Sequence, residues 1–214
     1  MVSSASGNVG DGIAAPEVLT ERDRQRTETR RRVRQVTLDV IRREGLSDAR
    51  IDEIARLAGV SRGTVYFHYP TKEHVLGEVL GEAEARVVDA LSQLPRTAPM
   101  AKLLDVFCAA YAREWEREAE IFPSVAVVAL QRAAAAIKTR DLNPVHKVLA
   151  ARFRLTSERG ELTEAMRPGV LADVFLTNVL TATLAWCGRP RQRLASVLGD
   201  VVEVFLNGAC GRKK

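Results

Sequence analysis

The sequence predicts an all-α protein with a small basic helical head and a larger helical body. Apolar residues recur at spacings of three and four through most of the chain, and no stretch has the alternation of a half-buried strand. Of the 214 residues, 46% are hydrophobic, which is enough to bury a core. We expect a disordered lead over residues 1–21, the head over 22–72 and the body over 73–214.

Three helices are predicted in the head. The first runs from about residue 27 to 44 and ends before Gly45, which suits the left-handed position after a helix. A short second helix runs from about 51 to 59. Ser61 can cap the third helix, which stops at Pro70. Two helices of about two turns, separated by a glycine turn, therefore follow each other directly.

Six longer helices are predicted in the body. They cover about 71–94, 98–118, 121–138, 143–159, 169–187 and 190–207. Pro95 closes the first of them, and Pro190 occupies a permitted first-turn position in the last.

The charge is unevenly distributed along the chain. The head carries 13 Lys or Arg against 7 Asp or Glu, a balance of +6, whereas the net charge of the whole chain is +5. The residues after it carry 19 against 17, and the first 21 carry three acids and no base. A basic segment beside a near-neutral body indicates a polyanionic partner, either nucleic acid or an acidic membrane.

The remaining composition points to a cytoplasmic protein. The N-terminus lacks the basic start and apolar stretch of a secretory signal, and no run of about 18 apolar residues is present. Cys108, Cys187 and Cys210 are too few and too far apart for a disulfide framework or a zinc knuckle, so no metal or cofactor is expected.

The segment VSRGTVYFHYPTKE, residues 60–73, collects aromatic residues in a chain that is otherwise poor in them. On a two-turn helix, Val65 and Tyr69 lie on one side and can pack inward. The other face would show Arg62, Gly63, Thr64, Tyr66, Phe67 and His68, which suits a surface that contacts DNA. The alternative is that the aromatic residues belong to the core of a tight subdomain.

The head resembles the helix-turn-helix domain of the TetR family of bacterial transcription regulators. The resemblance lies in IDEIARLAGVSRGTVYFHYPTKEHVL, with its turn glycine, its aromatic residues and Lys72 at the family spacing. It covers about a quarter of the chain. It implies that the third helix enters the major groove of double-stranded DNA.

The resemblance also implies roles for individual residues. Arg62, Gly63, Tyr66 and Phe67 would face bases, and Thr64, His68 and Lys72 would face phosphates. Ser61 is also expected to contact DNA. Arg50 stands where the family often has threonine; it cannot cap the second helix, but it can still reach a phosphate.

The arginine-rich stretch from Arg22 to Arg34 directly precedes the head motif. It is either a solvated helix start or an arm or helix end that lies along the DNA backbone or in the minor groove.

An aromatic stripe in the body is either core or the lining of a cavity. By resemblance, the cavity would bind a small hydrophobic effector. The residues expected to line it are Phe107, Tyr111, Trp115, Phe122, Phe153, Phe175 and Asn178.

The last two predicted helices are apolar on more than one face, which predicts a homodimer through residues 169–207. The apolar seam of the final helix consists of Leu194, Val197, Leu198, Val201, Val202 and Phe205. Two recognition helices related by a two-fold axis would read an inverted-repeat operator.

The function expected is a ligand-responsive transcriptional regulator, most often a repressor in the family that it resembles. A DNA-binding regulator or activator controlled by a protein partner is the alternative. An enzyme is not expected, because the chain has three histidines and none of the common catalytic motifs. A membrane role is disfavoured, because the basic stretch lacks interleaved large apolar residues.

Overall fold

The computed structural model describes residues 20–139, 143–162, 166–189 and 191–209, which form helices and no strand. The helices are α1 (Glu21–Glu44), α2 (Ile51–Ala58), α3 (Arg62–His68), α4 (Lys72–Ser92), α5 (Met100–Trp115), α6 (Phe122–Thr139), α7 (Pro144–Glu158), α8 (Pro168–Gly188) and α9 (Leu194–Ala209). The all-α prediction is confirmed for these residues. Almost all of the expected disordered lead, Pro190 and Cys210 lie outside them.

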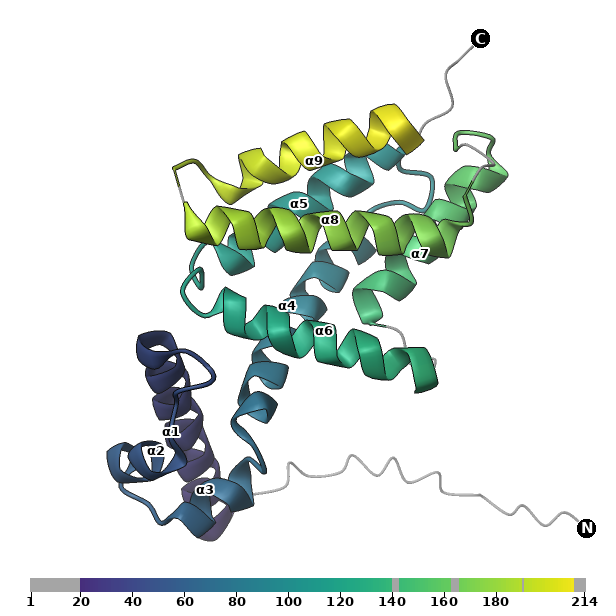
Figure 1. Cartoon of the computed structure of the whole chain (residues 1–214). Helices are drawn as coiled ribbons and strands as arrows, with labels where there is room; N and C mark the ends of the chain where they lie inside the picture. Colours follow the sequence, from purple (N-terminus) through teal and green to yellow (C-terminus); the bar gives the residue numbers. More distant parts are fainter. Residues whose placement is uncertain (1–19, 140–142, 163–165, 190, 210–214) are drawn as a thin grey trace, which may run out of the picture.

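The head consists of α1, α2 and α3, and α4 extends from it into the body (Figure 1). Its core is small and aliphatic, with Val33, Ile41, Ile54 and Val65 almost fully buried. Tyr69, just after α3, is buried with them, as its spacing from Val65 predicts.

The first helix begins earlier than its apolar pattern predicts, at Glu21 instead of about residue 27. Thr20 and Asp23 form a capping box, in which each side chain accepts a hydrogen bond from the other residue's backbone N–H at 3.2 Å. The stretch from Arg22 to Arg34 is therefore the first half of α1 and not a separate arm.

The turn between α2 and α3 follows the predicted chemistry. Gly59 adopts the left-handed conformation, with φ 63°, and ends α2. The Ser61 hydroxyl then accepts a hydrogen bond from the Thr64 backbone N–H at 3.1 Å, which caps α3 as expected.

In the body, α5, α6 and α7 pack on α4, α8 packs on α6 and α7, and α9 packs on α5 and α8 (Figure 1). Its last helix begins at Leu194 and not near Pro190. The indole Nε1 of Trp186 donates to the Gln192 carbonyl at 2.7 Å and holds the connection between α8 and α9.

One described helix, α8, is long and apolar enough to span a membrane by length and composition, although no such segment was expected. A third of its most apolar window is buried inside the chain. It carries Asp173 and packs along α7 and α9, so its apolar character also fits a packing helix of the body.

Candidate functional site

The exposed face of α3 carries large aromatic side chains. Phe67 is 65% exposed and Tyr66 is 45% exposed, and Arg62 and Gly63 are exposed beside them. Burial of these two rings would stabilise the fold, so their exposure indicates a role in binding. Thr64 is half-buried, and its hydroxyl lies 2.9 Å from that of Ser61.

His68 is not on this face, contrary to the expectation from the sequence. It is 8% exposed, and its ring lies edge-on to that of Phe67, with the ring centroids 5.1 Å apart. Burial, followed by the neighbouring cations of Arg30 and Arg26, lowers its pKa. The exposed face of α3 is therefore narrower than the residue order indicates, and the lowered pKa favours the neutral imidazole.

Two arginines of α1 support the aromatic residues around α3. The Arg26 guanidinium lies over the Phe67 ring at 5.1 Å, and that of Arg30 lies over the Tyr69 ring at 4.4 Å. Arg30 also donates to the His68 carbonyl at 2.9 Å. The arginine-rich start of α1 thus lies beside the recognition helix and positions part of it.

Paired charges join α1 to α4. Arg30 bonds to Glu78, and Arg34 donates to Glu82 at 2.8 Å. The Tyr69 hydroxyl donates to the second Glu78 oxygen at 3.0 Å, and burial together with this carboxylate raises the tyrosine pKa to about 12. Sequence reasoning missed this network, although Arg30 and Arg34 match Glu78 and Glu82 in spacing.

Lys72, at the start of α4, is half-buried and has a structural role in this state. Its Nζ donates to the Ser47 carbonyl at 3.1 Å and to the Ala49 carbonyl at 3.0 Å. These bonds tie the first turn of α4 to the connection before α2. The ammonium thus lies at the junction of two elements of the head.

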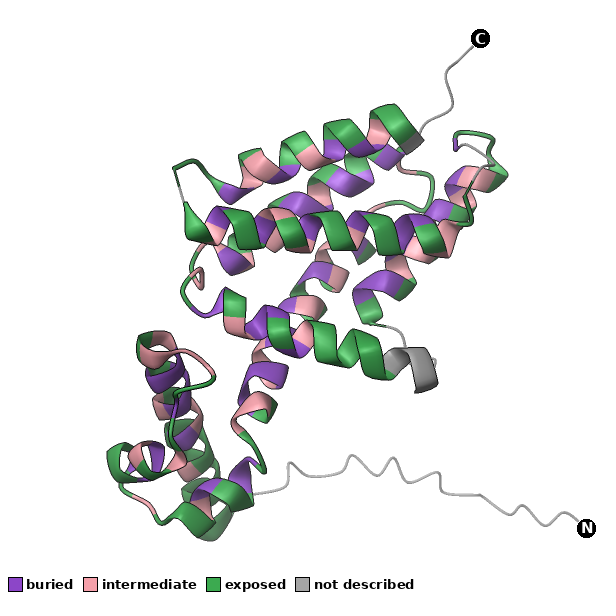
Figure 2. Ribbon diagram, in the orientation of Figure 1, coloured by how far each residue is buried: buried purple, intermediate pink, exposed green. Residues whose placement is uncertain are grey.

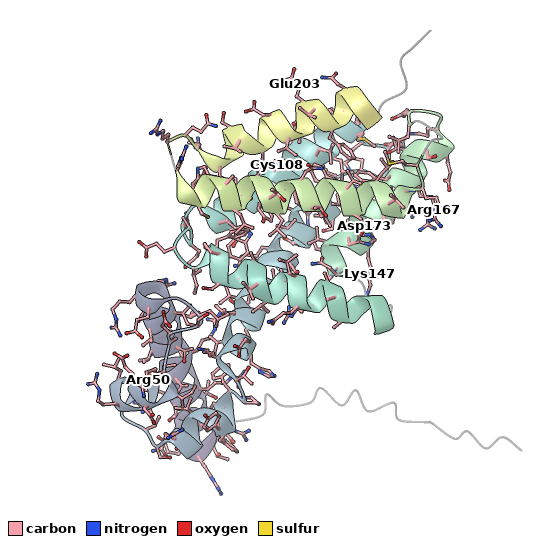
Figure 3. All side chains as sticks on the ribbon, in the orientation of Figure 1. Arg50, Cys108, Lys147, Arg167, Asp173 and Glu203 are labelled. Carbon is pink, nitrogen blue, oxygen red and sulfur yellow. The ribbon has the colours of Figure 1, made fainter. Side chains whose placement is uncertain are left out.

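Arg50 directly precedes α2, and Arg62 is the first residue of α3. Arg50 occupies the N-cap of α2 without a side-chain capping bond, as predicted, and its side chain is exposed (Figure 3). The Arg62 guanidinium lies 3.1 Å from the Asp52 carboxylate, with both side chains more than half exposed. Because the pair is exposed, phosphates or bases can compete for the arginine at little cost.

The predicted effector residues fall into two groups. Phe107, Trp115, Phe122, Phe153 and Phe175 are buried, and Tyr111 is half-buried. Their rings form a continuous cluster with Phe205, with neighbouring centroids 4.8–6.4 Å apart. The structure therefore brings the six aromatic residues into one cluster, in which Phe205 connects Phe153 to Phe175.

Asn178 does not join them. It is exposed on α8, whereas Phe175 and Val179 on the same helix are buried, and its amide donates to the Val174 carbonyl one turn back. The expectation of a polar group that faces inward at this position is wrong. Thr183 is the polar residue of α8 that is fully buried, and its hydroxyl bonds to the Val179 carbonyl.

A cleft of about 420 Å³ lies between α1, the middle of α4 and the turn from α5 to α6. Of the seven predicted effector residues, Trp115 alone lines it. This cleft lies between head and body and is separate from most of the aromatic cluster.

The paired helices α2 and α3, the glycine turn and the exposed face of α3 define a helix-turn-helix DNA-binding domain. Residues 34–79 match the family model described as "Bacterial regulatory proteins, tetR family". The head therefore matches the DNA-binding domain of the TetR family, and over this segment the chain is similar to transcription regulators that carry the domain.

Two transcription regulators are similar to this chain in sequence, one over the head and one over most of the chain. The transcriptional regulator SrpR of Pseudomonas putida is 47% identical over 57 residues, which are 27% of each chain. The matched segment thus spans about a quarter of that relative's length. The repressor KstR of Mycobacterium tuberculosis is 27% identical over 184 residues, which cover 83% of this chain and 78% of KstR.

Among solved structures, the repressor FadR of Thermus thermophilus in complex with lauroyl-CoA superposes with a TM-score of 0.58 and 25% identity. The alignment covers 86% of this chain and 97% of FadR. The similarity therefore extends through the body as well as the head.

Proposed function

We propose that the protein is a cytoplasmic, ligand-responsive repressor that binds an inverted-repeat operator as a homodimer and is released by a small hydrophobic effector. The observation that carries the DNA-binding part is the exposure of Tyr66 and Phe67 on a capped helix within a basic head. Such a face suits thymine methyl groups and base edges in a major groove.

We assign one group of residues to the DNA bases and another to the phosphates. Arg62, Tyr66 and Phe67 face bases, and Gly63 allows the backbone to approach closely. Phosphates are contacted by Arg50, Ser61, Thr64 and Lys72. His68 is left out of the proposed set because it is buried and neutral.

The proposed dimer interface comprises the outward faces of α8 and α9, within residues 169–207. These helices lie side by side, and exposed residues follow their outer faces (Figure 2). Val170, Val174 and Leu184 are exposed on α8, and Val204 is 74% exposed on α9. An apolar side chain as exposed as Val204 favours burial by a second subunit.

The seam expected on α9 faces mainly inward. Leu194, Leu198, Val202 and Phe205 are buried against the same chain, and Val197 and Val201 are half-buried. Their spacing of three and four directs them to α5 and α8. The interface on α9 is therefore expected around Val204, with Val197 and Val201 at its inner edge.

The proposed effector site is the aromatic cluster of the body. Its apolar rings suit a hydrophobic ligand, and the similar FadR structure contains lauroyl-CoA. Because the rings contact one another, an entering ligand would separate them and displace α5 relative to α8. Release of DNA then requires the ligand to prefer the displaced state, by about 1.4 kcal/mol for each tenfold loss of DNA affinity.

Selection of bound duplexes from a random DNA pool tests this function. The parent protein without ligand should enrich an inverted repeat, and the variant F67A should enrich a degenerate one. If the parent enriches no sequence, or enriches one half-site only, the proposed dimeric reader is wrong.

A further inference from the structure

The cleft between head and body has three walls. Arg34, Leu38 and Arg42 come from α1, and Val79, Glu82, Ala83 and Arg86 come from α4. The third wall is the end of α5 and the following turn, with Arg113, Glu114, Trp115, Arg117, Glu118 and Ile121. Its volume of about 420 Å³ lies within the range of small-molecule sites.

The carboxylates of the cleft are already paired. Glu82 binds Arg34 at 2.8 Å, Glu114 binds Arg86 at 2.6 Å, and Glu118 binds Arg42 at 2.7 Å. Five arginines line the cleft and three of them form these pairs. In the described part of the chain, no ion pair engages Arg113 or Arg117, so the cleft has two uncompensated positive charges.

Two further features of the cleft suit a ligand that has both an apolar part and a hydrogen-bond acceptor. Trp115, Ile121 and Leu38 are buried and supply apolar surface beside the arginines. The Arg34 Nε is also buried without a hydrogen bond, because its nearest carboxylate oxygen, on Glu78, is 3.6 Å away. A buried donor of this kind favours an acceptor in the cleft.

We infer that this cleft binds a small amphipathic anion, a carboxylate on an alkyl or aryl body. The carboxylate pairs with Arg113 and Arg117, and the apolar part lies on Trp115 and Ile121. The site is distinct from the aromatic cluster proposed for the effector. Arg34 and Leu38 of α1 form the facing wall, so the occupant contacts the head as well as the body and links the position of the head to ligand binding.

Tryptophan fluorescence tests the inference without DNA. The chain has two tryptophans, so W186F leaves Trp115 as the single reporter. In this background, octanoate should change the emission saturably, whereas octanol and inorganic phosphate, which lack the charge and the apolar body respectively, should bind at least tenfold more weakly. The pair R113Q/R117Q should weaken octanoate binding at least tenfold.

The matched control is R96Q/R154Q, which removes the same charge from exposed arginines outside the cleft. In the W186F background it should bind octanoate as tightly as W186F alone does. Thermal unfolding of each variant verifies its fold. Equal octanoate binding by R113Q/R117Q would place the ligand elsewhere, including at the aromatic rings that contact Trp115, and would overturn the inference. Absence of octanoate binding, or equal binding of octanol or phosphate, would also overturn it.

Discussion

At the scale of single residues, Phe67 and His68 show how one helix divides its neighbours between folding and binding. Phe67 is exposed under the Arg26 guanidinium, whereas His68 is buried beside Arg30. The sequence predicts the aromatic face of α3, but it does not predict this division. Seven residues form only two turns, and the packing of α1 decides which side chain faces inward.

The exposure of Phe67 predicts that F67A separates DNA affinity from stability. The substitution removes the ring contacts of Phe67 with Arg26 and His68 but no buried apolar side chain, so the free energy of unfolding should change by about 1 kcal/mol or less. DNA binding should weaken by about 1–3 kcal/mol through the lost base contact. Calorimetry and fluorescence anisotropy with the selected duplex measure the two effects. V127A, at an exposed site on α6, is the control and should change neither; an F67A protein that binds as the parent does would show that Phe67 lies off the DNA.

The lowered pKa of His68 predicts an acid-sensitive head. Below the ordinary histidine pKa of 6.5 the unfolded chain takes up a proton that the folded state resists, so stability is lost as the pH falls. The unfolding free energy of the parent should fall more steeply between about pH 7 and pH 5 than that of H68Q, which does not titrate there. Chemical denaturation across this range measures the slopes. Parallel slopes would mean that His68 is protonated equally in both states.

At the scale of elements, the start of α4 joins the recognition helix to the body. Arg30 and Arg34 of α1 meet Glu78 and Glu82 of α4, and Lys72 bonds to the connection before α2. The helix boundaries of the head follow from local signals, the Ser61 cap and the Gly59 turn. The ion-pair network does not, because it depends on how α1 and α4 lie side by side.

Lys72 is expected to act on DNA affinity partly through this junction. K72A removes two charged hydrogen bonds to backbone carbonyls, so it should destabilise the protein by about 1–3 kcal/mol as well as weaken binding to all DNA sequences. Thermal unfolding and binding at several salt concentrations measure both. K102A, at an exposed lysine of α5, is the control. A K72A protein with unchanged stability and weaker binding would assign Lys72 to phosphate contact alone.

At the scale of the whole molecule, the chain is a DNA-reading head attached to a helical body by α4 (Figure 1). The apolar periods of the body predict its helices closely. They also predict an interface seam on α9, but most of those residues are buried within the same chain. Periodicity reports that a face is apolar, but not whether the covering helix comes from the same chain. Asn178 shows the same limit, since an amide in an apolar helix can face solvent as well as a cavity.

The outward faces of α8 and α9 predict that V174E/V204E is a monomer. Burying two carboxylates without partners at a subunit interface costs several kcal/mol, whereas both sites are exposed within one chain. Light scattering at micromolar concentration should show the parent as a dimer and this variant at half that mass. L130E, on the exposed face of α6, should remain dimeric. A dimeric V174E/V204E protein would place the interface elsewhere.

The most direct test of a dimeric DNA reader is binding to the selected operator with its half-sites moved apart. The measurement is the affinity and stoichiometry of the parent protein on the operator before and after insertion of about 5 base pairs, half a helical turn, between the half-sites. A two-fold dimer that reads both half-sites through α3 should bind as one dimer per duplex and lose most of its affinity on insertion. Unchanged affinity after insertion would contradict the proposed symmetry and leave the protein a reader of single half-sites.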